Sequence, residues 1–194
     1  SGTPDISLLQ THALYPNITN EKHSPDNVYV GAYLVENSSL ASVASPDGGY
    51  FLEMVADVNL GADEHIGFTL QGLTVGAVTT VSFYWGNHGW GNGPYIWADA
   101  SASMAFTYNG SLVHQTAVAP YNPNVWFQTS FTFVPAATSV KLVAKVLTVA
   151  GTTINGQNVD RAALGIDGFT ATQGSCINDT DGDGIANNLD LDSD

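Results

Sequence analysis

The sequence predicts an all-β protein: an antiparallel β-sandwich of the jelly-roll type, followed by an irregular C-terminal tail. Short apolar runs separated by Gly, Asn and Pro recur over residues 28–172, and several alternate apolar and polar residues with a period of two. No window shows the sustained 3.6-residue period of a helix. Because 44% of the 194 residues are hydrophobic, the chain can fill one large core. We therefore expect a sandwich over residues 1–174 and a separate segment over 175–194.

We expect about nine strands after an irregular lead-in over residues 1–27 that has at most one edge strand. Residues 129–133 and 140–146 alternate apolar and polar side chains, as half-buried antiparallel strands require. The pair Asn109-Gly110 predicts a hairpin, because both residue types accept positive φ at the centre of a tight turn. The expected strands are 28–35, 50–58, 66–70, 79–85, 98–108, 111–117, 126–134, 140–147 and 162–172.

The charge balance is strongly acidic, with 18 acidic against four basic residues and a formal net charge of −14. Four scattered cations cannot form a basic patch, which argues against nucleic acid and anionic membrane surfaces as partners. No apolar run approaches the roughly 18 residues of a membrane span. The single cysteine, Cys176, cannot form a disulfide within the chain. A chain so acidic suits a salt-rich and calcium-rich exterior, and we expect an extracellular location, secreted or on a cell surface.

An oxygen-rich segment near the end of the sequence has the spacing of a calcium loop. Calcium takes about six to eight oxygens, and a twelve-residue loop supplies them from positions 1, 3, 5, 7, 9 and 12, with glycine at position 6. A merely solvated acidic tail, which is the alternative, has no reason to place Gly184 at that sixth position. The expected Ca2+ ligands are Asp179, Asp181, Asp183, the carbonyl of Ile185, Asn187 and Asp190.

This segment resembles the thrombospondin type 3 repeat of secreted and cell-surface bacterial proteins, in the form DTDGDGIxNxxDLDSD. The residues after the loop lack the helical period that an EF-hand needs. The resemblance implies repeats that wrap calcium with little regular structure, the last aspartates of one repeat opening the next. Asp190, Asp192 and Asp194 then begin a second loop, and we expect further domains of a longer parent chain.

Two other phrases loosely resemble secreted jelly-roll modules, both carbohydrate-binding and adhesive ones. They are the last apolar run, which contains Asp167, and the turn cluster that contains Asp47. In such modules an acidic residue on the final strand helps to bind a structural calcium near the sheet edge. The resemblance thus implies Asp167 and Asp47 as ligands of a second Ca2+, with Asp26 and Asp57 as further candidates. The alternative is that Asp167 is an outward-facing residue in an alternating strand.

The glycine-rich stretch 85–97 holds three of the four tryptophans. Sugar rings stack on Trp and Tyr, and their hydroxyls bind fixed amides, so a loop of this composition favours glycan recognition. The alternative is that Trp85 and Trp97 point into the core. Residues 121–126 form a second, weaker candidate that contains another tryptophan. The expected glycan ligands are Asn87, His88, Trp90, Asn92, Tyr95 and Trp97.

These features favour an extracellular, calcium-dependent, non-catalytic module that binds a polysaccharide or cell-surface glycan. One alternative is a structural repeat unit or stalk of a large adhesin that makes protein contacts only. A third is a glycan-degrading hydrolase or lyase, in which two of Glu36, Glu53 and Glu64 would face a common cleft. The sequence lacks a nucleophile elbow, a His-Glu-x-x-His helix and a phosphate-binding glycine loop.

Overall fold

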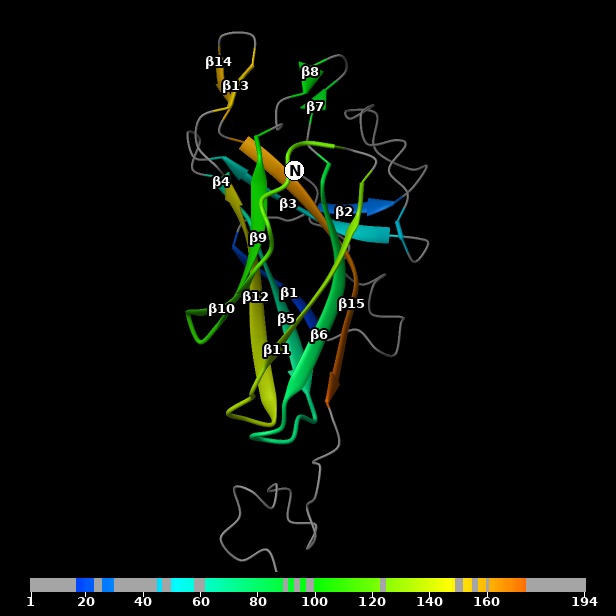
Figure 1. Ribbon diagram of the computed structural model, residues 1–194, viewed down its shortest axis with the longest axis vertical. Coiled ribbons are helices and arrows are strands. Elements are labelled where there is room, and N and C mark those ends of the chain that lie inside the picture. The colour runs from blue at the N-terminus through cyan, green and yellow to red at the C-terminus, as the bar shows by residue number, and fades with distance from the viewer. Residues whose placement is uncertain are drawn as a thin grey trace, which may run out of the picture.

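The computed structural model of the chain is built from β-strands (Figure 1). Its regular elements form two antiparallel sheets and two small hairpins, which confirms the predicted fold class. The structure describes residues 17–22, 26–29, 45–46, 50–57, 62–88, 91–92, 95–96, 100–122, 125–148, 152–154, 157–159 and 161–173.

The first sheet, called sheet A, has five strands in the order β1-β5-β12-β9-β10. Every neighbouring pair in it is antiparallel. Non-consecutive neighbours show that the chain crosses between the sheets, as jelly-roll topologies do. The strands are β1 (Asn17–Lys22), β5 (His65–Gln71), β9 (Ala102–Tyr108), β10 (Ser111–Gln115) and β12 (Ser139–Thr148).

The second sheet, called sheet B, has the order β11-β6-β15-β3-β2, and a short strand β4 pairs with β3 beside this path. Two hairpins, β7–β8 and β13–β14, stand apart from both sheets. Sheet B consists of β2 (Asp26–Tyr29), β3 (Tyr50–Asp57), β4 (Ala62–Asp63), β6 (Thr79–Asn87), β11 (Phe127–Phe133) and β15 (Arg161–Gln173). The hairpins are β7 (Gly91–Asn92) with β8 (Tyr95–Ile96), and β13 (Thr152–Ile154) with β14 (Gln157–Val159).

The core lies between the sheets and is filled mainly by alternate residues of their longer strands. In β6 buried and half-buried side chains alternate from Thr79 to Trp85, the period that a two-layer sandwich requires. Phe68 of sheet A stacks on Phe169 of sheet B, with ring centroids 4.1 Å apart, and Phe83 meets Phe106 at 4.9 Å. Aromatic pairs of this kind bury much apolar area and hold the two layers together.

The sandwich has two distinct ends (Figure 1). The β7–β8 and β13–β14 hairpins lie at one, which we call the hairpin end. At the other, the turn end, Gly76 N–H donates to the carbonyl of Pro135 at 3.0 Å, which joins two turns. The Gln173 amide there bonds both the N–H and the C=O of Thr74, at 2.8 and 3.1 Å, which fixes the end of β15.

Several sequence expectations are confirmed. Asn109 and Gly110 adopt φ values of 50° and 77° in the β9–β10 turn, as the hairpin signal predicts. The alternating runs 129–133 and 140–146 lie in β11 and β12. Strand β1 lies within the expected lead-in and forms an edge of sheet A. None of the described residues belongs to a helix long and apolar enough to cross a bilayer.

Candidate functional site at the hairpin end

The aromatic stretch begins where β6 reaches the hairpin end. Trp85 points into the core and donates its indole N–H to Thr129 Oγ1 at 3.1 Å, which confirms the core alternative for this tryptophan. Asn87 is 1% exposed. Its side-chain amide donates to the carbonyls of Ala100 and Ala119, at 2.8 and 3.0 Å. Asn87 therefore works as a cross-link between loops rather than as a surface ligand.

His88 is fully buried on the outer face of sheet B. Its ring lies against Gly86 of β6 and Gly165 of β15, which are register partners. A Cβ atom at Gly86 would lie 2.4 Å from His88 Cε1, and one at Gly165 would lie 2.7 Å from its Cδ2. Real Cβ atoms do not approach this closely, so both strand glycines make room for one imidazole ring.

Two further aromatic rings complete what we call the aromatic cluster: Phe51, His88 and Trp126. The His88 and Trp126 centroids are 4.3 Å apart, and Phe51 meets Trp126 edge-on at 5.1 Å. Phe51 is buried although it lies outside the inter-sheet core. The cluster therefore forms a second apolar layer on the outer side of sheet B, against which a loop can be held rigidly.

The cluster brings together the two aromatic-rich segments that the sequence separates. The backbone N–H of Asn122 donates to the carbonyl of Asn87 at 2.8 Å, beside the contact between His88 and Trp126. Tyr121 and Trp126 are half-buried, and Asn122 is exposed. Aromatic and amide side chains from both segments thus share the hairpin end.

The prediction that Asn87 and His88 present side chains to a glycan disagrees with the structure, because both side chains are buried: Asn87 between two loops, and His88 against Gly86 and Gly165. Asn92 and Tyr95 are direct partners in the β7–β8 hairpin, and their side chains lie outside the described set. Trp90 and Trp97 lie outside the described residues. The sequence analysis did not identify Phe51 and Gly165 as part of this site, although a glycine inside a strand is itself a signal that another group approaches the backbone closely.

Two acidic residues are also buried on this face. Glu53 is fully buried, and its register partner is Gly165, the glycine under His88. Asp167 is 6% exposed; it accepts a hydrogen bond from Ser45 Oγ at 2.5 Å and one from the N–H of Gly168 at 2.8 Å. Asp167 points outward from sheet B, as the alternative expects, but it is covered rather than solvent-exposed.

The calcium role expected for Asp167 finds no supporting ligand set among the described residues. Calcium needs about six to eight oxygens, whereas the carboxylate of Asp167 accepts hydrogen bonds from Ser45 and Gly168. Within the ranges given above, no group of three or more His, Cys, Asp or Glu side chains could hold a metal. Asp47, its expected partner, lies outside those ranges, as do Asp179, Asp181, Asp183, Ile185, Asn187, Asp190, Asp192 and Asp194.

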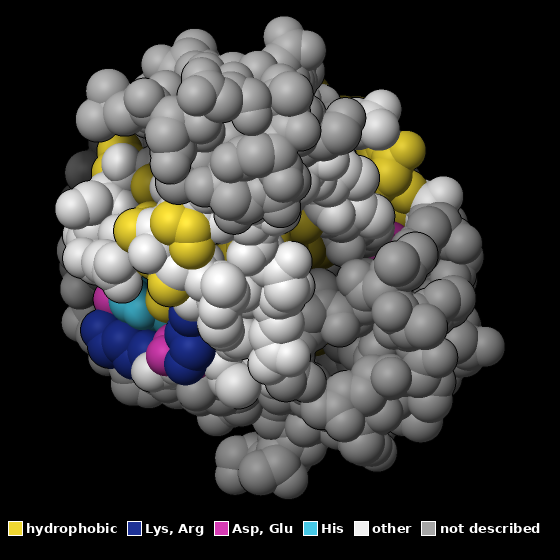
Figure 2. Space-filling view, turned by 90° about the horizontal axis from the view of Figure 1, so that it is seen from below, with side chains coloured by type: hydrophobic (Ala, Val, Ile, Leu, Met, Phe, Trp, Pro, Cys, Tyr) yellow, Lys and Arg dark blue, Asp and Glu magenta, His cyan; other side chains and the backbone are white. Residues whose placement is uncertain are grey.

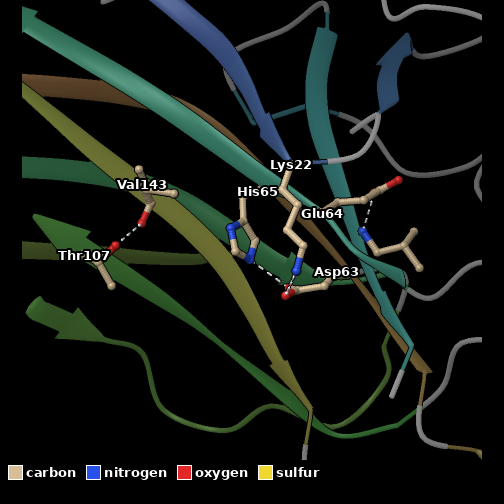
Figure 3. A network of polar contacts seen from close by, with 7 residues as sticks. Lys22, Asp63, Glu64, His65, Thr107 and Val143 are labelled. Atoms are coloured by element: carbon tan, nitrogen blue, oxygen red, sulfur yellow. Dashed lines mark hydrogen bonds and ion pairs between the residues drawn. The ribbon is translucent and has the colours of Figure 1, made fainter. Parts of the chain in front are cut away.

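Charged groups lie along the outer side of sheet A instead; Figure 3 shows Lys22 and His65 of this sheet beside Asp63 of β4. Asp63 accepts hydrogen bonds from Lys22 Nζ and His65 Nε2, both at 2.8 Å. Burial acts to raise the pKa of Asp63, but the bonds from Lys22 and His65 outweigh it and hold that pKa below its usual value. Lys141 Nζ contacts Glu21 Oε1 at 2.7 Å, and this bond lowers the pKa of Glu21.

No protein-family model matches this sequence, and no curated protein matches it. Among solved structures, the CBM22-2 xylan-binding domain from Paenibacillus barcinonensis Xyn10C is similar with a TM-score of 0.47 and 14% identity, over 81% of this chain and 92% of that one. TmCBM61 in complex with β-1,4-galactotriose is similar with a TM-score of 0.41 and 12% identity, over 81% of this chain and 87% of that one. CBM36 in complex with calcium and xylotriose is similar with a TM-score of 0.40 and 8% identity, over 79% of this chain and 94% of that one. These values describe a similarity of overall β architecture and assign no residue or ligand.

Proposed function

We propose that this chain is a non-catalytic, extracellular module that binds a polysaccharide or cell-surface glycan at its hairpin end. The observation that carries the proposal is the junction of residues 87–88 with residues 121–126, through the Asn122–Asn87 hydrogen bond and the aromatic cluster. Two segments rich in aromatic and amide side chains meet there on a rigid base. The carbohydrate ligands of the structurally similar modules agree with this proposal without carrying it.

The chemistry of such an end suits neutral sugars. Aromatic rings bind the flat C–H faces of sugars, while amides donate to and accept from their hydroxyls. Trp126 is half-buried, with one side packed on His88 and Phe51. A ring held in this way loses little conformational freedom when a ligand arrives, which favours affinity.

We propose no hydrolase, because the described acids on this side of the molecule are not placed for one; Glu36 lies outside the described residues. A glycosidase needs two carboxyl groups about 5–10 Å apart that flank the substrate. Glu53 and Asp167 are buried beneath the surface, and Glu64 accepts the backbone N–H of Val55 at 2.7 Å. Buried carboxyl groups cannot reach a glycosidic oxygen.

Titration with a panel of soluble polysaccharides and oligosaccharides, followed by calorimetry and affinity electrophoresis, tests the hairpin-end site. We expect binding to at least one neutral glycan, and a loss of tenfold or more in affinity in Trp90→Ala, Trp97→Ala and Asn122→Ala. Val75→Ala, an exposed position at the turn end, is the matched control and should bind normally. Absence of binding to every glycan, or equal affinity in all variants, would contradict the proposal.

We also propose that residues 175–194 carry a thrombospondin type 3 calcium-binding repeat that becomes a stiff spacer when Ca2+ binds. The support is the ligand spacing from Asp179 to Asp190. Calcium would join carboxylates that otherwise repel one another. Limited proteolysis should cut between Cys176 and Asp194 readily in chelator and slowly in millimolar Ca2+. The double variant Asp181→Ala/Asp183→Ala should be cut equally fast in both, whereas calcium-independent cleavage of the unaltered chain would contradict the proposal.

One observation favours a second function, contact with another protein domain. Val75, Val78 and Val134 are about half exposed, and the bond from Gly76 to Pro135 brings their two turns together at the turn end. Figure 2, which views this end, shows hydrophobic side chains on the surface. Exposed apolar groups that gather in this way can mark a contact surface.

A further inference from the structure

The outer face of sheet B is lined with hydroxyl groups in its half nearer the turn end. On β6 the side chains of Val81 and Phe83 enter the core, whereas Thr80 and Ser82 point outward. A bulge at Gly168, with φ of 55°, turns Phe169 inward on β15, so that Thr170 and Thr172 are exposed. We call this surface the hydroxyl face; its members are Thr80 and Ser82 of β6, Ser130 and Thr132 of β11, and Thr170 and Thr172 of β15.

Strand register places these hydroxyls on a grid. Thr132, Thr80 and Thr172 are direct partners across three strands, and so form one row. Ser130, Ser82 and Thr170 form the next row. Neighbouring strands lie about 4.8 Å apart, and residues two apart along a strand about 6.7 Å apart. The two rows therefore present hydroxyls at regular intervals in both directions.

The hydroxyls are open to a ligand. Ser130, Thr132, Thr170 and Thr172 are exposed. In the described part of the chain, the one hydrogen bond of the six side chains is a long one of 3.4 Å, from Thr170 Oγ1 to the carbonyl of Ser82. A hydroxyl is both donor and acceptor, so each can bind a sugar hydroxyl in either sense.

The face is also free of charge, which is unusual for this chain. Neither β6 nor β11 contains an acidic or basic residue, and the two charged residues of β15, Arg161 and Asp167, precede the bulge. Strand β11 is an edge of sheet B, and edge strands commonly carry charges that prevent unwanted pairing. On a protein with a net charge of −14, a neutral edge and face fit an uncharged partner.

We propose that the hydroxyl face is a second carbohydrate-contact surface, which takes the flat side of an extended, neutral polysaccharide. The proposal rests on the proposed function for its class of ligand, but on different residues. A repeating chain can place successive hydroxyls along a row, whereas a single sugar reaches only part of it. Each contact is weak in water, so the face acts on long or packed chains, where many contacts form together.

Co-sedimentation with insoluble neutral polysaccharides (microcrystalline cellulose, insoluble xylan and insoluble mannan) tests the proposal. The variant Ser130→Ala/Thr132→Val/Thr172→Val removes three hydroxyls and keeps the strand propensity of the threonines. We expect binding to at least one of these solids to fall tenfold or more, with an unchanged melting temperature. The matched control Thr69→Val/Ser111→Ala/Thr138→Val, which lies away from this face, should sediment like the unaltered protein.

The two sites fail separately in this design. If the hydroxyl-face variant keeps its affinity for soluble oligosaccharides but loses the solid, both proposals stand. If the unaltered protein binds no soluble glycan and the hydroxyl-face variant loses binding to the insoluble polysaccharide, the hairpin-end site is rejected and the hydroxyl face is kept. Equal sedimentation of the variant and the control, or no binding to any of the three solids, overturns the inference. The inference is also overturned if the unaltered protein inhibits ice-crystal growth, the variant does not, and the two sediment equally with the polysaccharides. The hydroxyl face would then be a surface that binds ice.

Discussion

The two outer faces of this sandwich carry opposite chemistry. Along sheet A, charged side chains have partners: Lys141 of β12 pairs with Glu21 of β1, and Lys22 of β1 pairs with Asp63 of β4, the short strand of sheet B. Figure 2 shows acidic and basic side chains together on one side of the molecule. On sheet B, the aromatic cluster covers the half nearer the hairpin end, and the neutral hydroxyl face occupies the half nearer the turn end. The net charge of −14 therefore describes neither face. Groups that already have partners stabilise the fold, whereas unpaired neutral groups remain available for a ligand.

The largest effect is expected where sheet B is covered. Gly165→Ala places a Cβ atom 2.7 Å from His88 Cδ2, and overpacking of this kind costs roughly 1–3 kcal/mol. Urea unfolding should show this loss. Adding His88→Ala to Gly165→Ala empties the same space, so the double variant should be more stable than the sum of the two single changes predicts. Strict additivity would show that the ring and the glycine are not coupled.

A smaller effect is expected at the side of the sandwich where β10 meets β11. The His114 ring stacks on Phe131 with centroids 4.7 Å apart, and burial lowers the pKa of His114 below its ordinary value of 6.5. Because the folded state then binds a proton less readily than the unfolded chain, stability is full above pH 6.5 and falls as the pH drops through the range between the two pKa values.

His114→Phe should remove this part of the pH dependence. The comparison is the free energy of unfolding of the two proteins at pH 7.5 and pH 5, measured in urea. The variant should lose less stability than the unaltered protein on acidification, since phenylalanine keeps the stack without a proton site. An identical loss in both proteins would mean that His114 titrates as it does in the unfolded chain.

The smallest effects are expected from the ion pairs of sheet A. Lys22 and Asp63 are each more than a third exposed, so water and salt screen the pair, and Lys22→Met should cost at most about 0.2–1 kcal/mol. The lowered pKa values of Asp63 and Glu21 give a stabilisation that is present above their usual values of 3.8 and 4.5 and is lost as the pH falls through the lower folded values. The loss of unfolding free energy caused by Lys22→Met should be smaller in 1 M than in 0.1 M salt. A loss that salt does not change would point to packing instead.

What could be predicted from the sequence was set by local rules. The alternation in 140–146 and the Asn109-Gly110 turn depend on neighbouring residues, and both are confirmed. The burial of His88 depends on Gly165, which lies far along the chain and reaches it only through the pairing of β15 with β6. No local pattern contains that information. The hydroxyl face was missed for the same reason, because its rows join β11, β6 and β15. The calcium loop and the aromatic residues Trp90 and Trp97 remain predictions.

The central claim, that carbohydrate is bound on the sheet B side, is tested most directly by NMR. Backbone amide resonances are assigned and followed while neutral oligosaccharides, such as xylohexaose and β-1,4-galactotriose, are added. We predict shifts at Asn122, at Trp126 and along β6 and β11, and none at Lys141 to Lys145 on sheet A. Shifts confined to sheet A, or no shift with any neutral saccharide at millimolar concentration, would contradict the claim.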